Sequence, residues 1–201
     1  MNLKQVLINK FIRGRKPLSI AGDVFFFGFL LMLLIPSTRS IILSGVAVAR
    51  TWITNPEIPE SQRVALSDEA WGWNLIDPQG KVVPFDSFRG EVIFLNQWAT
   101  WCPPCRAEMP AIEKLFRATG NKVKFVILTA EDPQKVRQFI EKEGYTFPVY
   151  IGSVEGPELA ARSIPSTVII DRTGKIVVNR KGAFNWNSGK VKRLLVKLSI
   201  R

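Results

Sequence analysis

The sequence contains no histidine and only two cysteines among its 201 residues. Histidine is the side chain that most often serves as general base and metal ligand near neutral pH. Its absence means that any such role would have to fall to another residue type. A structural zinc site needs four Cys or His ligands, and this chain could supply two. Carboxylates or a second subunit would have to complete such a site. The sequence therefore predicts neither a bound metal ion nor a cofactor.

Acidic residues are scarce as well, with 17 Asp and Glu against 28 Lys and Arg. Residues 1–50 hold seven cations and one acid, Asp23, so +6 of the net +11 lies there and +5 in the other 151 residues. Cations that flank an apolar segment are typical of membrane topology. Because no motif that reads a nucleic-acid groove accompanies the charge, we expect a membrane partner and no nucleic acid.

Long apolar runs are almost missing, since the longest one, Val24–Ile35, has only twelve residues. Extending it back to Leu18 gives a segment of the roughly 17 to 20 residues that a membrane span needs. Its basic flank predicts a cytoplasmic N-terminus and an exported C-terminal part. The expected organisation is a basic cytoplasmic segment, a transmembrane anchor, an interfacial segment with linker, and a folded domain: residues 1–17, 18–36, 37–64 and 65–201.

A cleaved signal peptide is the alternative to a retained anchor. Ala47-Val48-Ala49 resembles a small-x-small cleavage site. It lies far beyond the end of the apolar run, which favours the anchor and a single-pass protein of the inner membrane. Both interpretations place the domain in the periplasm or its extracytoplasmic equivalent, an oxidising compartment in which a disulfide has a use.

The two cysteines, Cys102 and Cys105, are separated by Pro103 and Pro104 in the stretch WATWCPPC. A structural disulfide between them would close a very small loop and would stabilise the fold little. Two inert buried thiols are a further alternative. The spacing favours a redox pair that opens and closes during function.

Strand and helix patterns alternate through the second part of the chain. The segment 91–98 is a nearly continuous run of β-forming residues, typical of a strand buried on both faces. A mixed central sheet with helices on both faces is expected. Further strands are predicted within 71–85, 122–130, 147–152, 166–171 and 175–180, and helices at 103–119, 132–144, 155–163 and 188–199.

Three motifs resemble the thioredoxin fold: LNQWATWCPPC, the proline five residues after Cys105 (Pro110), and SIPST before the final hairpin. The motif NxWATWCPPCxxEMP, together with the expected N-terminal anchor, resembles the TlpA/ResA-like membrane-anchored thiol–disulfide oxidoreductases of the thioredoxin superfamily. The likeness covers about residues 65–201. It implies an α/β thioredoxin fold with an N-terminal hairpin extension and an inserted strand and helix, at about Tyr145–Arg162, behind one transmembrane helix.

The resemblance implies a catalytic, redox-active disulfide between Cys102 and Cys105. Cys102, at a helix N-terminus that favours a thiolate, is the expected nucleophile, and Cys105 resolves the mixed disulfide. Pro103 and Pro104 fix the start of the helix but remove two N–H donors and bring no cation. We therefore expect a weakly stabilised thiolate and a reducing pair.

Other motif residues are expected around the cysteines. Glu108, one turn after Cys105, would move protons for that thiol, unless it is an ordinary solvated helix residue. Pro165 is expected to be cis and to face the cysteines, with Ile164 offering backbone groups to an extended substrate. Trp101 would form an apolar lip beside the thiols.

The leading functional hypothesis is an extracytoplasmic protein-disulfide reductase that acts on exported proteins and is recharged by a transmembrane electron donor. The client stays open among apocytochrome c, in a role in cytochrome c biogenesis, an assembling copper protein and another exported oxidoreductase. A thiol peroxidase would need its reactive cysteine in a different setting. A metal carrier fits poorly with a chain that has no histidine and three methionines. A client-binding module would not require the cysteine pair.

Overall fold

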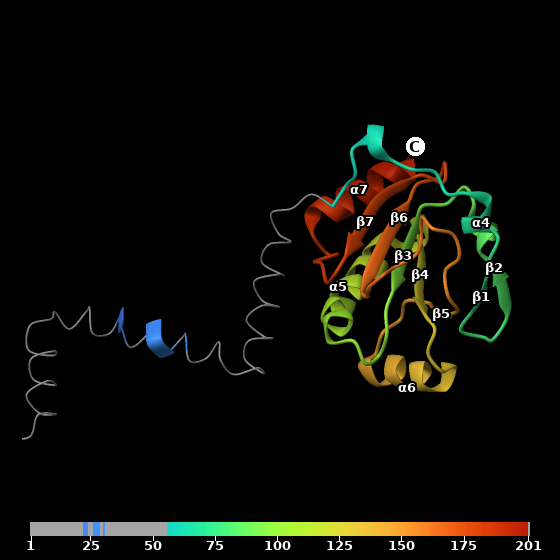
Figure 1. Ribbon diagram of the computed structural model, residues 1–201. Coiled ribbons are helices and arrows are strands. Elements are labelled where there is room, and N and C mark those ends of the chain that lie inside the picture. The colour runs from blue at the N-terminus through green and yellow to red at the C-terminus, as the bar shows by residue number, and fades with distance from the viewer. Residues whose placement is uncertain (1–21, 24–25, 29, 31–55, 201) are drawn as a thin grey trace, which may run out of the picture. The chain divides into compact units, whose positions relative to one another are not determined.

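The computed structural model describes residues 22, 23, 26–28, 30 and 56–200 (Figure 1). Most of the expected anchor, 18–36, and all of the basic segment 1–17 lie outside the described residues. In the part of the chain that is described, no helix is both long and apolar enough to cross a membrane.

The centre of the molecule is one mixed sheet of seven strands in the order β2-β1-β5-β4-β3-β6-β7. Strands β3, β4 and β5 are parallel, and all other neighbouring pairs are antiparallel. The central strands are buried on both faces, which explains their continuous apolar sequences. The strands are β1 Asn74–Ile76, β2 Val82–Pro84, β3 Ile93–Gln97, β4 Lys124–Thr129, β5 Val149–Ile151, β6 Ser166–Ile170 and β7 Ile176–Lys181.

Three helices, α5, α6 and α7, lie where the sequence indicates, whereas the short α4 was not predicted. The longest, α5, starts with two prolines, whose missing N–H groups have no partner in a first turn, and stops at Gly120. Asp132 caps α6 by accepting from the N–H of Lys135. The helices are α4 Asp68–Trp71, α5 Pro103–Thr119, α6 Pro133–Glu143 and α7 Gly189–Ile200, with 3₁₀ turns η1 Glu60–Gln62, η2 Phe85–Phe88 and η3 Gly120–Lys122.

The expectation of helices on both faces of the sheet is correct only in part. Buried side chains of α5, α6 and α7 all belong to one cluster, on the face of the sheet that carries Phe94 and Phe125. The other face, with Ile93 and Leu95, is covered by the short α4, by η2 and by irregular chain. Both parallel crossovers, β3 to β4 and β4 to β5, run in the same direction. Right-handed connections therefore put α5 and α6 on the same side.

The helix expected at 155–163 is wrong, because the whole connection from β5 to β6 is irregular. Gly156 adopts a φ of 81°, which is outside the helical range. The carbonyl of Leu159 accepts from the Gln97 side chain instead of from a helical N–H, and Glu158 bonds to Ser67. Tertiary contacts thus replace the hydrogen bonds that a helix would make within this segment. The helix that accompanies the additional strand β5 is α6.

The expected N-terminal hairpin is present as β1 and β2, at one edge of the sheet (Figure 1). Its turn is closed by Asp77, whose Oδ1 accepts from the N–H groups of Gln79 and Lys81. Gly80 takes the positive φ of 82° that the turn requires.

The opposite edge strand, β7, is covered by the segment 56–66. The N–H of Ile58 donates to Val177 O at 2.8 Å, the N–H of Ile176 donates to Val64 O at 2.8 Å, and that of Leu66 donates to Gly174 O at 3.0 Å. Part of the stretch expected to be a linker therefore lies against the sheet. An edge covered in this way offers fewer free backbone groups to another chain.

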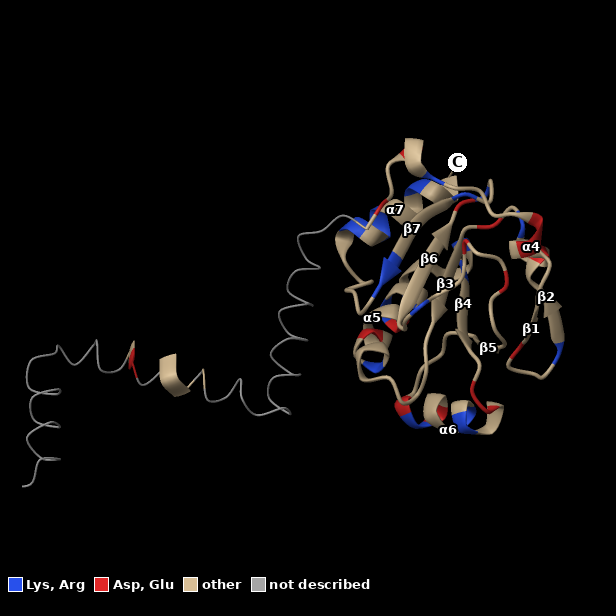
Figure 2. Cartoon of the chain, viewed as in Figure 1, with Lys and Arg blue, Asp and Glu red and all other residues tan. Residues whose placement is uncertain are grey.

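Charged residues of both signs are interspersed along the chain of the domain, and α6 carries both (Figure 2). Residues 56–200 contain 20 Lys and Arg and 16 Asp and Glu, a net +4. This nearly balanced surface agrees with a basic excess concentrated near the N-terminus.

Candidate active site

The two cysteines form a disulfide at the start of α5, with their Cα atoms 5.3 Å apart. Cys102 is the N-cap residue, and its Sγ accepts from the N–H of Cys105 at 3.3 Å. Pro103 and Pro104 have no N–H to offer, so a single backbone donor of the first turn reaches this sulfur. Arg106 directs its guanidinium elsewhere, towards Glu143 at 3.9 Å and over the ring of Phe139.

The loop before β6 reaches the disulfide from a distant part of the sequence. The Ile164–Pro165 peptide bond is cis, as expected. The carbonyl oxygen of Ile164 lies 3.9 Å from Cys102 Sγ, to which only a reduced thiol could donate a proton. The predicted substrate-binding residues thus lie beside the predicted nucleophile.

Glu108 is buried in the interior, with 2% of its surface exposed, so the alternative of a solvated helix residue is wrong. Its Oε2 accepts from the indole N–H of Trp186 at 3.0 Å and from the N–H of Phe184 at 3.1 Å. Its Oε1 accepts from Asn96 Nδ2 at 2.8 Å. Burial raises the pKa of Glu108 to about 7, although these three donors oppose the rise. A carboxyl with this pKa can both take up and release a proton near neutral pH.

Asn96 links Glu108 to the neighbouring strand, because its Nδ2 also donates to Thr167 Oγ1 at 2.8 Å. Its Oδ1 is buried and has no hydrogen-bond partner among the described residues. If the amide turns over, a protonated Glu108 can donate to that oxygen. The pair can therefore satisfy either protonation state of the carboxyl.

The two tryptophans that flank the cysteines differ in exposure. Trp98 is buried and packs against Phe139, whereas 67% of Trp101 is exposed. A pocket of about 560 Å³ opens beside Trp101. Residues of the loop 97–101 and Glu131 line it, together with residues of the segment 152–164, Ile164 among them.

Glu131 is a second carboxylate near the cysteine loop, and the sequence motifs did not single it out. It accepts from the Thr100 backbone N–H and hydroxyl and pairs with Lys135 Nζ at 2.6 Å. Burial would raise its pKa, but these partners outweigh burial and lower it. Glu131 therefore stays ionised and holds the backbone two residues before Cys102.

The partners of Glu108 could be found from the sequence only in part. Asn96 is a polar residue inside an apolar strand, which is a signal for a buried hydrogen bond. Trp186 carries no such signal, because it lies 78 positions from Glu108 along the chain. In the described residues, no cluster of three or more Cys, His, Asp or Glu side chains is placed to hold a metal ion.

The fold agrees with comparisons to known proteins. The Redoxin family model matches residues 56–195. The thiol-disulfide oxidoreductase ResA of Bacillus cereus is 31% identical over 148 residues, which cover 71% of this chain and 83% of the relative. ResA of Halalkalibacterium halodurans is 32% identical over 137 residues, 66% of this chain and 77% of the relative.

Solved structures show the same fold at lower identity. A thioredoxin-family thiol:disulfide interchange protein from Chlorobium tepidum is 22% identical with a TM-score of 0.54, over 70% of this chain and 99% of that one. A secreted thiol-disulfide isomerase from Corynebacterium glutamicum is 18% identical with a TM-score of 0.56, over 72% and 94% of the two chains. The present chain therefore belongs to the Redoxin family, as a TlpA/ResA-like thiol–disulfide oxidoreductase of the thioredoxin superfamily.

Proposed function

We propose that this oxidoreductase is a membrane-anchored reductase that opens disulfides in exported proteins. The observation that carries the proposal is the Cys102–Cys105 disulfide at the start of α5, facing the Ile164 carbonyl. Both residues are buried, Cys102 with 3% of its surface exposed and Cys105 with none, and Cys102 Sγ is the sulfur that lies beside the Ile164 carbonyl.

In the first step, the Cys102 thiolate attacks one sulfur of a substrate disulfide. A mixed disulfide forms, the substrate S–S bond breaks, and one substrate thiolate leaves. The Ile164 backbone binds the extended substrate segment by strand-like hydrogen bonding, and Trp101 covers it from the exposed side.

In the second step, Cys105 loses its proton and attacks Cys102 Sγ. The Cys102–Cys105 disulfide re-forms and the second substrate thiolate leaves, so the substrate has gained two electrons and, from solvent, two protons. Glu108, one helical turn along α5, is the group that accepts the Cys105 proton. A transmembrane dithiol donor returns two electrons to the enzyme before the next cycle.

The charge pattern supports the proposed location. Lys and Arg before the apolar segment favour a cytoplasmic N-terminus and a single-pass anchor in the inner membrane, with the catalytic domain outside. There, oxidised client proteins are available as substrates.

Trapping tests the order of the two cysteines. In Cys105→Ser, the mixed disulfide cannot be resolved, so exported clients should accumulate as disulfide-linked adducts that dithiothreitol releases. The adducts are separated on diagonal gels and identified by mass spectrometry. Insulin reduction by dithiothreitol should be accelerated by the wild type.

Cys102→Ser is the matched control and should neither trap clients nor reduce insulin. A Cys102→Ser protein that still trapped clients would reverse the assigned roles. Rapid turnover of peroxide by the wild type, with slow insulin reduction, would favour the thiol peroxidase instead.

A further inference from the structure

The segment Gly152–Ile164 forms one wall of the pocket beside the disulfide, although it contains no regular structure. Its residues Ala160, Ala161 and Ile164 line the pocket together with Trp101. A connection of this length without helix or strand depends on contacts to the rest of the fold for its position. Those contacts therefore determine where the substrate wall lies.

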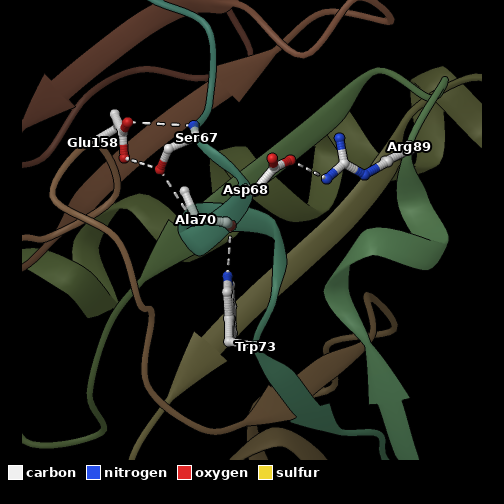
Figure 3. Close-up of polar contacts among 6 residues, drawn as sticks. All are labelled: Ser67, Asp68, Ala70, Trp73, Arg89 and Glu158. Atoms are coloured by element: carbon white, nitrogen blue, oxygen red, sulfur yellow. Dashed lines mark hydrogen bonds and ion pairs between the residues drawn. The ribbon is translucent and has the colours of Figure 1, made fainter.

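Two adjacent residues attach the segment from opposite sides. The carbonyl of Leu159 accepts from Gln97 Nε2 at 2.9 Å, which ties the segment to the last residue of β3. Glu158 reaches the other way, to the segment 67–73 around α4, which precedes the β1–β2 hairpin and is called the N-terminal extension below. Its Oε2 accepts from the Ser67 hydroxyl at 3.1 Å, and its Oε1 accepts from the Ser67 N–H at 3.3 Å (Figure 3).

The N-terminal extension is a firm support for this attachment. Ser67 caps α4 by accepting from the N–H of Ala70, whose carbonyl in turn accepts from the buried Trp73 indole at 2.9 Å (Figure 3). Asp68 pairs with Arg89, and the Arg89 guanidinium lies over the Trp71 ring at 4.5 Å. This single turn of helix is thus bonded to Trp73, just before β1, and to Arg89, just after η2.

Backbone packing places the segment directly on α4. A Cβ atom on Gly156 would lie 2.6 Å from the Cβ of Ala70, so the two backbones approach more closely than any other residue would allow. The Glu158–Ser67 bonds therefore span two chain segments that already touch. They fix the register of that contact, 91 positions apart in the sequence.

We propose that Glu158 and Ser67 are a positioning pair for thiol–disulfide exchange with protein substrates. By holding Gly152–Ile164 on α4, they keep the pocket wall and the Ile164 carbonyl in register with Cys102. Neither residue lines the pocket. The inference rests on the proposed reduction of protein disulfides, and it adds the N-terminal extension to the determinants of substrate binding.

The pair is tested by comparing two substrates on the full-length enzyme. Glu158→Ala should raise the KM for insulin about fivefold, the effect of losing about 1 kcal/mol of hydrogen bonding, and leave kcat unchanged. The rate with a small aromatic disulfide, which needs no peptide-binding wall, should not change. Glu158→Gln keeps one acceptor and should restore part of the KM.

Glu155→Ala is the matched control, because it removes an exposed glutamate from the same segment and should change neither rate. Ser67→Ala removes the hydroxyl bond but keeps the bond from the backbone N–H, so it should raise the insulin KM by less than Glu158→Ala does. The double variant should be no worse than Glu158→Ala alone. Ser67→Thr, which keeps the hydroxyl, should restore binding.

Equal losses with both substrates would show general disruption of the site and overturn the proposal, as would an unchanged insulin KM in folded Glu158→Ala. Thermal melting identifies variants that are simply unfolded. If Glu158→Ala is one of them, the insulin KM of Glu158→Gln tests the proposal in its place. If the wild type itself fails to reduce insulin, the proposed function fails. If the wild type reduces insulin and the variants do so equally well, the proposed function stands and only the positioning pair is refuted.

Discussion

At the scale of single residues, Glu108 is the most informative side chain, because its environment works against its charge. Burial raises its pKa from 4.5 to about 7. The folded protein then binds this proton more tightly than the unfolded chain does. Its contribution to stability is present in full below pH 4.5 and is lost as the pH rises through 7.

Glu108→Gln should remove this dependence on pH, because an amide does not titrate. Relative to the variant, the wild type should lose about 3 kcal/mol of unfolding free energy between pH 4 and pH 8. Urea denaturation at both pH values measures the difference. A difference between the two proteins that stays constant with pH would show that the carboxyl titrates normally.

The direction of electron flow is also decided by single atoms. Cys102 Sγ receives one backbone N–H, two prolines withhold theirs, and Arg106 directs its charge towards α6. A weakly stabilised thiolate makes the dithiol a good electron donor. We predict a potential nearer that of thioredoxin, about −270 mV, than that of a strong oxidant, about −120 mV.

Equilibration in glutathione buffers, followed by counting free thiols, measures this potential. A value above about −150 mV would assign the enzyme to disulfide formation instead of reduction.

How far the sequence predicts the site depends on separation along the chain. The cysteines and the Ile164–Pro165 bond are carried by short motifs and lie where these indicate. The partners of Glu108 and the contact of Glu131 with Thr100 come from elements that only the folded sheet brings together. Hydrogen bonds of this kind leave little pattern in a single sequence.

At the scale of elements, caps and periodicity predict most of the fold. Asp132 with Gly144 bounds α6, and the buried residues of α7, which are Val191, Leu194, Leu195 and Leu198, recur at helical spacing. The failure at 155–163 has a physical cause, because a composition suited to a helix was outweighed by Gly156 packing on Ala70 and by the bonds of Glu158. Local preference is a weak guide where a segment has strong distant partners.

Gly156→Ala should destabilise the domain more than Gly182→Ala does. Both glycines have a φ of 81°, so both substitutions carry the same backbone cost, about 1 kcal/mol. Only at 156 does the new methyl group meet Ala70, whereas at 182 it meets no described atom within 4 Å. We expect an additional loss of about 1 to 3 kcal/mol for Gly156→Ala. Chemical denaturation of both variants gives the comparison, and equal losses would mean that the contact with α4 is loose.

At the scale of the whole molecule, the uneven charge predicts how the chain is oriented. Residues 1–50 carry +6, and the described domain is close to balance (Figure 2). Reporter fusions after Trp52 should be active only with a reporter that works outside the cytoplasm. A mature protein that begins at Arg50 would contradict the retained anchor but not export.

The pairing of residues 56–66 with β7 also limits how far the catalytic domain can move from the proposed anchor. If the span ends at Pro36, 19 residues, 37–55, remain to connect it to the sheet. Fully extended, they reach at most about 65 Å, whereas the stretch 37–64, if all of it were free, would reach about 95 Å. Pairing with the sheet edge thus shortens the maximal reach of the connecting segment by about a third. The enzyme would then reduce only those exported clients that approach the membrane surface to within this distance.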